Sequence, residues 1–270
     1  MNILHLIFAW LLASSLRASL LALAVVCLQV ALGRWLPARW RYALWLPVLL
    51  VLVAPILPAT RWSLENCFAH KPSPLTATSD TVTASLPPGA ETPLEAPSSA
   101  PTGSAMLDGR DLLLAAWLLG ASGMLAAGAI GYRRTLLRLA RNQVETPFPL
   151  CGAVASAAAQ IGLTRLPRVL VSTAVESPAV AGLLRPTLLL PASFPEGFSP
   201  AEARLILLHE LTHLKAWDLP LNWLLCLLQA LHWFNPLLWI AFARIRGDRE
   251  AVCDARVLFA DAGDRRADYG

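Results

Sequence analysis

One stretch decides how the rest of this chain is interpreted: Leu207-Leu208-His209-Glu210-Leu211-Thr212-His213. His209 and His213 are four residues apart, so on a helix they lie on the same face, about one turn from each other. In this HExxH pattern the two imidazoles bind zinc, and the carboxylate that follows the first histidine activates water. The pattern therefore predicts His209 and His213 as metal ligands and Glu210 as the catalytic residue. The alternative is an ordinary helix that carries two surface histidines.

The residues before this stretch carry the signals of a helix start. Ser199 suits the N-cap, Pro200 suits the first helical position, and Glu202 completes a Ser-x-x-Glu capping box. Leucines on both sides of the histidine face supply apolar contacts. The motif is thus expected on a helix that begins at about residue 200.

A zinc peptidase also needs a third protein ligand and one open coordination position. A second strongly helical stretch, Arg249-Glu250-Ala251-Val252-Cys253-Asp254, offers Glu250 as the natural third ligand. Asp254, one turn further on, can accept a hydrogen bond from the outer nitrogen of a ligand histidine, and we assign the same orienting role to Asp218. His232 is a weaker alternative ligand, for which a structural, hydrogen-bonded role is favoured.

The spacing His209-Glu210-x-x-His213 followed by Glu250-x-x-x-Asp254 resembles the gluzincin pattern of membrane-embedded peptidases. More narrowly, the chain resembles the BlaR/MecR-type antirepressor metallopeptidases of bacterial β-lactam sensing. The narrower resemblance rests on residues 177–182, 185–191 and 233–237 and on the pair Cys253-Asp254. Upstream of residue 177 the resemblance is loose and lies mainly in the arrangement of the membrane spans. Sensor members of the family carry a further span and an extracellular penicillin-binding domain, and we expect this chain to lack that C-terminal domain because nothing follows Gly270.

The resemblance implies a membrane-embedded zinc endopeptidase that performs site-specific proteolysis in signal transduction. Its expected substrate is a cytoplasmic transcriptional repressor or the chain itself, cleaved in a response to antibiotics or cell-wall stress. Two other functions stay open: a housekeeping protease that clears damaged membrane proteins, and a non-enzymatic signalling scaffold that keeps the zincin fold. The expected partners are the lipid bilayer, a protein substrate and a second copy in a homodimer, without direct nucleic-acid binding.

The composition is too apolar for an ordinary soluble domain, with 56% hydrophobic residues and a mean hydropathy of +0.54. The net charge of +4 is modest, and the arginines stand beside the apolar blocks, where they indicate membrane orientation and not a nucleic-acid surface. The five cysteines show no CxxC or paired spacing. This cysteine pattern predicts neither a disulfide scaffold nor a cysteine zinc site.

The apolar blocks and the arginines together predict the membrane topology. Residues 1–57 are expected to form a transmembrane hairpin; the first block is read as a span and not a signal peptide, since no basic region precedes it. Residues 58–110 are rich in Pro, Ser and Thr and are expected to form a flexible extracytoplasmic loop. A third span covers residues 111–131, and arginines follow it. In a bacterial inner membrane, this puts the N-terminus outside and residues 132–270 in the cytoplasm.

Residues 132–270 read as a small α+β zincin-like domain. A helix is expected over residues 152–163, a strand over residues 168–172, and a hairpin whose turn lies near residue 185 and whose second arm covers residues 187–190. In zincins an edge strand pairs with extended substrate. We assign that role to Val180, Ala181, Gly182 and Leu183, with a plain sheet hairpin as the alternative.

The apolar segment 219–242 is long enough to cross a bilayer once. A single crossing would put Glu250 on the opposite side of the membrane from His209, and the two could not share a metal ion. Asn235-Pro236 is a good helix breaker in the middle of the segment. We therefore predict a mainly α membrane protein with three transmembrane helices and a cytoplasmic α+β domain that includes a re-entrant helical hairpin at 219–242.

Overall fold

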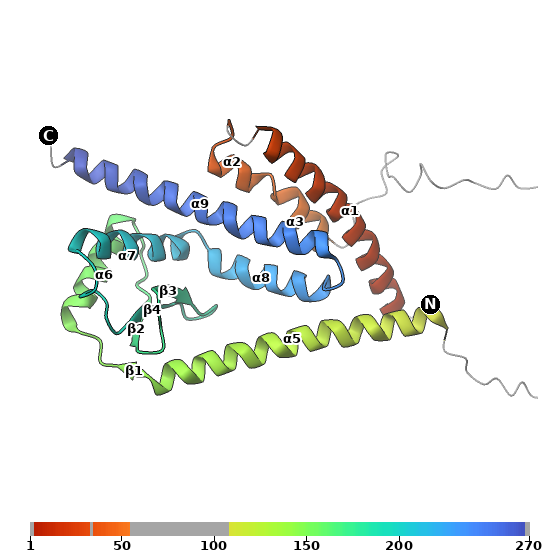
Figure 1. Cartoon of the computed structure of the whole chain (residues 1–270), viewed down its shortest axis with the longest axis horizontal. Helices are drawn as coiled ribbons and strands as arrows, with labels where there is room; N and C mark the ends of the chain where they lie inside the picture. The colour runs from red at the N-terminus through yellow and green to blue at the C-terminus, as the bar shows by residue number, and fades with distance from the viewer. Residues whose placement is uncertain (1–2, 33–34, 55–107, 268–270) are drawn as a thin grey trace, which may run out of the picture. The chain divides into compact units, whose positions relative to one another are not determined.

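The computed structural model describes residues 3–32, 35–54 and 108–267, with side chains described as far as residue 260 (Figure 1). The chain divides into a unit of Met1–Pro55 with Leu113–Gly270 and a second unit of Ile56–Leu112. Almost all of the loop expected over residues 58–110 lies outside the described residues.

The N-terminal segment contains one long helix and two short ones, α1 (Ile3–Leu32), α2 (Ala38–Ala43) and α3 (Leu46–Val53). The second half of the expected transmembrane hairpin, a span that ends at residue 57, consists in its described part of these two short helices. Pro47 lies at the start of α3 and has no N–H to donate to the carbonyl of Ala43, so the helix is interrupted between α2 and α3.

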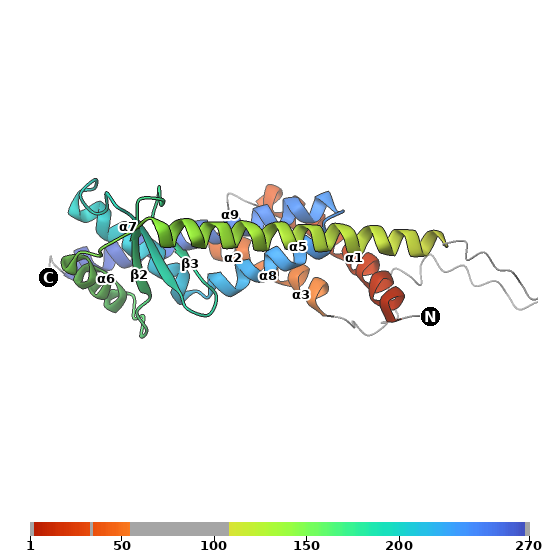
Figure 2. The same ribbon diagram turned by 90° about the horizontal axis from the view of Figure 1, so that it is seen from below.

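Among the described helices, α1 and α5 (Gly109–Arg141) are long and apolar enough to cross a membrane. α5 was expected over residues 111–131, and it continues for ten more residues through the arginine cluster. α5 lies alongside α8 (Figure 2), where the indole nitrogen of Trp117 donates to the carbonyl of Leu231 at 2.8 Å. A Cβ atom on Gly120 would lie 2.2 Å from the ring of Trp233, so this contact requires glycine.

A small four-stranded sheet adjoins these helices, built from β1 (Gln143–Val144), β2 (Arg168–Ser172), β3 (Ala179–Ala181) and β4 (Thr187–Pro191) in the order β1-β2-β4-β3. The strand predicted over residues 168–172 is confirmed, and so is the β3–β4 hairpin, whose strands pair antiparallel. The helix predicted at 152–163 is present as α6 (Phe148–Gln160). The sequence did not indicate β1, which has only two residues, or the parallel pairing of β2 with β4.

The predicted motif helix is α7 (Pro200–Lys215), and its capping box is present as expected. The Glu202 amide donates to the Ser199 hydroxyl at 3.3 Å, and the Ser199 amide donates to the Glu202 carboxylate at 2.9 Å. α7 packs between α6, the sheet and α9. The buried residues of this core include Leu150, Val154, Val171, Leu188, Leu190, Leu207, Leu208 and Leu211.

The chain after α7 forms α8 (Asp218–Leu231) and α9 (Pro236–Ala267), which lie side by side (Figure 1). The break between them contains Asn235, whose side-chain oxygen accepts from the amides of Leu237 and Leu238 and so caps α9. The Asn235 amide group also donates to the hydroxyls of Ser15 and Ser19 on α1, at 2.7 Å each. The second apolar arm was expected to end at residue 242, but α9 continues unbroken to Ala267 because nothing in its sequence interrupts the backbone ladder.

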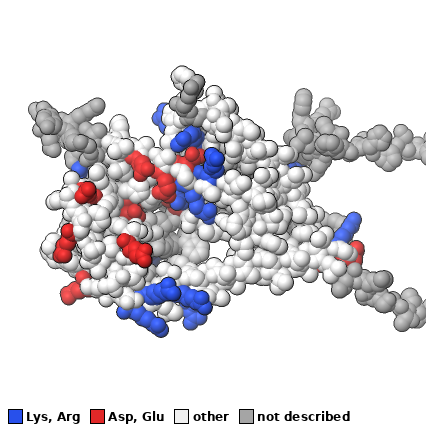
Figure 3. All heavy atoms as spheres, in the orientation of Figure 1, with Lys and Arg blue, Asp and Glu red and all other residues white. Residues whose placement is uncertain are grey.

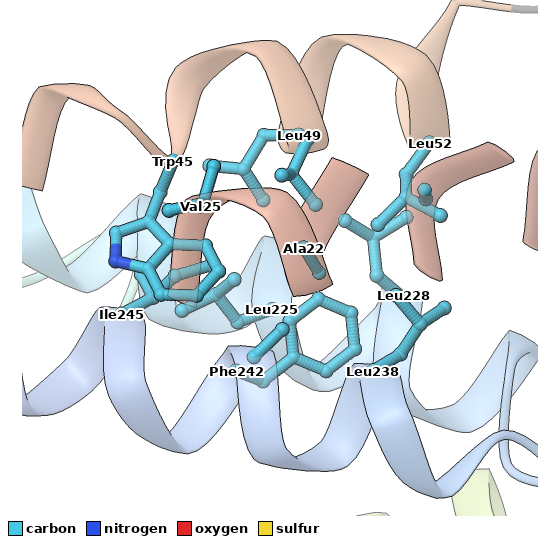
Figure 4. Close-up of a cluster of buried hydrophobic side chains, with 13 residues drawn as sticks. Ala22, Val25, Trp45, Leu49, Leu52, Leu225, Leu228, Leu238, Phe242 and Ile245 are labelled. Atoms are coloured by element: carbon cyan, nitrogen blue, oxygen red, sulfur yellow. The ribbon is translucent and has the colours of Figure 1, made fainter. Parts of the chain in front are cut away.

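α9 is held against the N-terminal helices by a buried apolar cluster (Figure 4). The members labelled there are Ala22, Val25, Trp45, Leu49, Leu52, Leu225, Leu228, Leu238, Phe242 and Ile245. One turn beyond this cluster, the Asp248 carboxylate accepts from the Trp45 indole at 2.8 Å and from the Gln29 amide at 2.9 Å. Arg41 lies 3.7 Å from the other carboxylate oxygen. α9 is therefore anchored two residues before Glu250.

Charged side chains are unevenly distributed on the face drawn in Figure 3. They gather over the sheet, α6, α7 and the adjoining ends of the long helices, whereas the surface over α1, α8 and the first half of α9 is largely uncharged. Many large apolar side chains of α1, α5, α8 and the first half of α9 are exposed, including Leu16, Leu20, Leu23, Leu119, Leu227 and Ile240. An apolar surface of this extent is typical of a protein that contacts lipid.

Candidate metal centre

The two motif histidines converge at one point on α7. Their Nε2 atoms lie 3.2 Å apart, and their rings meet edge to face. His213 is buried, whereas about a quarter of the His209 side chain is exposed. Residues four apart on a helix were expected to share a face, and this expectation is confirmed.

α9 brings the Glu250 carboxylate to the same point. Its Oε2 atom lies 3.2 Å from His213 Nε2 and 3.7 Å from His209 Nε2. The other carboxylate oxygen accepts from the Arg249 guanidinium at 3.0 Å, which leaves Oε2 facing the imidazoles. Bond lengths of about 2.0–2.2 Å to a tetrahedral zinc ion separate its nitrogen and oxygen ligands by roughly 3.3–3.6 Å. The three side chains therefore fit a zinc ion.

The outer nitrogens of both imidazoles meet the two aspartates expected there. His213 Nδ1 lies 2.7 Å from the carboxylate of Asp218, which is buried. His209 Nδ1 lies 3.1 Å from the Asp254 carboxylate, which is mostly exposed. A carboxylate in this position holds the Nδ1–H tautomer and turns Nε2 toward a metal ion.

The charges around the site shift the pKa values of its groups. Burial lowers the pKa of His213, but hydrogen bonds with Asp218 and Cys253 and the charge of Glu250 outweigh it and raise that pKa to about 10. Burial is the main cause that raises the pKa of the Glu210 carboxyl, and the neighbouring histidines oppose it. A raised carboxyl pKa suits a group that must accept a proton and release it again near neutral pH.

The site also contains a residue that the cysteine spacing did not indicate. Cys253 is buried on α9, and its Sγ atom donates to the His209 carbonyl at 3.5 Å. Ligand atoms of His209, His213 and Cys253 all lie within 4.8 Å of one another. The cysteine spacing predicts no cysteine zinc site, whereas here a single cysteine lies beside two candidate ligands that come from another helix. Its position three residues after Glu250 was the available signal.

A cavity of about 520 Å³ opens onto these side chains and is lined by parts of α5, β3, α7, α8 and α9. Glu210 lies on its wall, together with Val180, Ala181 and Gly182. β3 is at the end of the sheet order, so one of its edges has no strand partner in the described sheet. Leu183, the fourth residue assigned to that edge, lies beyond β3 and is not part of the wall.

Two further side chains belong to the cavity wall, and a third that was considered as a ligand lies outside it. Tyr132 and Arg249 line the cavity although the sequence did not single them out. His232 is buried away from the metal cluster, and its Nδ1 lies 3.0 Å from the Leu228 carbonyl. This position agrees with the structural role favoured for His232.

Comparison with known proteins connects this geometry to a family. Residues 9–270 match the family described as BlaR1 peptidase M56. The regulatory protein BlaR1 of Bacillus licheniformis is 33% identical over 161 residues, which cover 57% of this chain and 25% of that protein. The methicillin resistance mecR1 protein of Staphylococcus aureus strain Mu50 is 38% identical over 87 residues, which cover 32% of this chain and 15% of that protein.

The mecR1 protein of Staphylococcus epidermidis aligns to the same extent. The chain thus spans about a quarter or less of the length of the curated relatives that it matches. The family itself, however, matches nearly the whole chain. The protein therefore belongs to the BlaR1 peptidase M56 family, which is a family of metallopeptidases.

Proposed function

We propose that this protein is a membrane-embedded zinc endopeptidase. The observation that carries the proposal is the convergence of His209, His213 and Glu250 from two helices, at separations that suit one zinc ion. Glu210, one residue from the first histidine, lies on the wall of the adjoining cavity. Two imidazoles and one carboxylate leave a fourth position open, as a catalytic zinc site requires.

The ion would polarise the scissile carbonyl and acidify a water molecule. Glu210 accepts the proton of the attacking water and transfers it to the leaving amine. Asp218 and Asp254 keep the imidazoles in the tautomer that presents Nε2 to the ion. Arg249 fixes one oxygen of Glu250 and so limits the rotation of that carboxylate.

The substrate is expected to bind as an extended peptide along β3. This strand contacts α7, and three residues from Val180 to Gly182 line the cavity at the candidate metal centre. Backbone groups at an open edge bind a peptide without regard to its side chains, so the walls of the cavity must supply selectivity. Tyr132 and Trp223 meet edge to face on that wall, with ring centroids 5.2 Å apart.

We also propose three spans, formed by α1, the α2–α3 region and α5, and a hairpin of α8 and the first part of α9 that dips into the membrane. The uncharged surface over these helices (Figure 3) and the arginines at the end of α5 support this arrangement. It puts the N-terminus outside and the catalytic domain in the cytoplasm of a bacterial inner membrane.

Native cysteines offer a direct test of this topology. Cys67 belongs to the proline-rich stretch, and Cys151 is exposed on α6. In variants that keep one of these two cysteines, an impermeant maleimide added to intact cells should label Cys67 and not Cys151. Labelling of Cys151 alone would mean that the topology is inverted.

The relatives named as regulatory BlaR1 and methicillin resistance mecR1 proteins support a role in regulated proteolysis. We infer that the chain cleaves a cytoplasmic transcriptional repressor or itself in a response to β-lactam or cell-wall stress, and that it can act as a homodimer. A protease for damaged membrane proteins would share the chemistry. A scaffold without activity would share only the fold.

The deciding experiment compares cells that express the wild type with cells that express Glu210→Gln, using mass spectrometry to identify new protein termini. Removing a general base should lower turnover on the order of 10²–10⁴-fold. Zinc content should stay near the wild-type level because Glu210 is not among the proposed ligands. Equal cleavage by both proteins would contradict the enzyme assignment, whereas many unrelated cleaved proteins would favour the housekeeping function over the signalling one.

A further inference from the structure

Cys253 has no role in the proposed peptide hydrolysis, yet it lies beside both motif histidines. Its side chain is buried between α7 and α9, and its ligand atom lies within 4.8 Å of those of both motif histidines. Glu250, one turn earlier on the same helix, is far more exposed. The two α9 side chains therefore approach the imidazoles from different sides: the carboxylate from the cavity, and the thiol from the protein interior.

A thiol beside two imidazoles and a carboxylate differs from the three protein ligands of an ordinary catalytic zinc site. Thiolate is a strong ligand for zinc, and sets of four protein ligands are typical of structural sites that leave no position for water. A catalytic site needs three protein ligands and one open position. If the sulfur binds with His209 and His213, whose ligand atoms it adjoins, while Glu250 binds from the cavity, the position that the reaction needs is filled.

We propose that the Cys253 thiolate is a fourth protein ligand that closes the metal site in a resting state. This inference rests on the proposed zinc function and adds a means of regulating it. On binding, the thiol releases its proton to solvent and a sulfur–metal bond takes the place of a water ligand, without oxidation or reduction. Activation requires a small shift of α9 or rotation of the cysteine side chain, which moves the sulfur away and admits water.

α9 is suited to deliver such a shift. It carries both Cys253 and Glu250, and Asp248 ties the same helix to Gln29 on α1 and to Trp45 beside α3. A rearrangement of the N-terminal helices would therefore reach the thiol through one continuous element.

The test uses the full-length protein in detergent, loaded with cobalt(II) in place of zinc. A cobalt–thiolate bond gives an intense near-ultraviolet charge-transfer band, which nitrogen and oxygen ligands do not give. The wild type should bind one equivalent and show the band, and Cys253→Ser should bind cobalt and lose it. Cys226→Ser is the matched control, because Cys226 lines the same cavity, and it should keep the band.

X-ray absorption of the zinc-loaded wild type gives a second readout that needs no variant, with a sulfur shell expected at about 2.3 Å. Basal proteolysis should also rise several-fold in Cys253→Ala. One equivalent of bound metal without a sulfur signal would overturn the thiolate ligand and leave the proposed protease intact. A wild-type protein that binds neither zinc nor cobalt would overturn the proposed protease itself.

Discussion

The two helices that carry the candidate metal ligands are held in place by different kinds of contact. α7 begins with its own capping box and packs within the compact core that it forms with α6 and the sheet. α9 begins at a cap on Asn235 that also contacts α1, and Asp248 joins it to the N-terminal helices. The histidine half of the site is thus positioned locally. The glutamate half depends on residues that are distant in the sequence.

This difference distinguishes the contacts that the candidate site requires from the contacts that can change its activity. Disturbing the N-terminal helices should leave the His209–His213 pair intact, because α7 itself contributes no residue to the buried apolar cluster that joins α9 to α1 and α3. The same disturbance should move Glu250 and Cys253. A division of this kind suits an enzyme whose activity is switched by a rearrangement, with a stable half that keeps the two histidines and a movable half that changes activity.

The largest expected effect is a loss of zinc affinity when a single ligand is removed, and it can be tested once for each helix. His213→Ala and Glu250→Ala should each weaken zinc binding on the order of 10²–10³-fold, because apparent zinc free energies of about 10–16 kcal/mol are shared among four ligands. Competition with a chromogenic chelator measures both affinities. If Glu250→Ala bound zinc as tightly as the wild type, α9 would supply no carboxylate ligand.

A smaller difference is expected between the two orienting aspartates. Asp218→Asn should weaken zinc binding about 10–100-fold, as is usual when the carboxylate behind a ligand histidine is removed. Asp254→Asn should cost less than tenfold, because its carboxylate is 63% exposed and its contact with His209 is longer. The same chelator titration compares them. An equal loss in both variants would mean that burial does not set the strength of these contacts.

The half of the site on α7 could be predicted from the sequence because its signals are local. The capping box, the spacing of the histidines and the strand from Arg168 to Ser172 are each contained within a few neighbouring residues. The contacts of Asp248 and Cys253 could not be predicted from local signals, because their partners are far away in the chain. Glu250 was found only because the HExxH pattern demands a third ligand, and the return of α9 was inferred from that demand.

Breaking the Asp248 anchor should test how far the glutamate half depends on the N-terminal helices. Asp248→Ala removes the acceptor for Trp45 and Gln29, so Glu250 loses a fixed position and zinc affinity should fall about tenfold. In the Glu250→Ala background the same change should have little further effect, since the two residues act through one ligand. Losses that add in the double variant would show that Asp248 acts on the fold in general.

The smallest effect is expected at the start of α7, where the contact is entirely local. Ser199→Ala removes the side-chain acceptor of the capping box, and N-cap losses of this kind cost about 1 kcal/mol. The zinc affinity should not change, because His209 lies more than two turns further along a helix whose core contacts persist. Thermal unfolding measures the first quantity and chelator titration the second.

This cap also has a defined pH dependence. The hydrogen bond from the Ser199 backbone amide, with that from its hydroxyl, lowers the pKa of Glu202 below its usual 4.5. The contribution of the ionised carboxylate is therefore complete above about pH 4.5 and is lost as the pH falls through the lowered pKa. The stability difference between wild type and Ser199→Ala should accordingly narrow in acid. If Ser199→Ala instead weakened zinc binding as strongly as Asp248→Ala, the histidine half would not be independent of its surroundings, and the division between the two helices would fail.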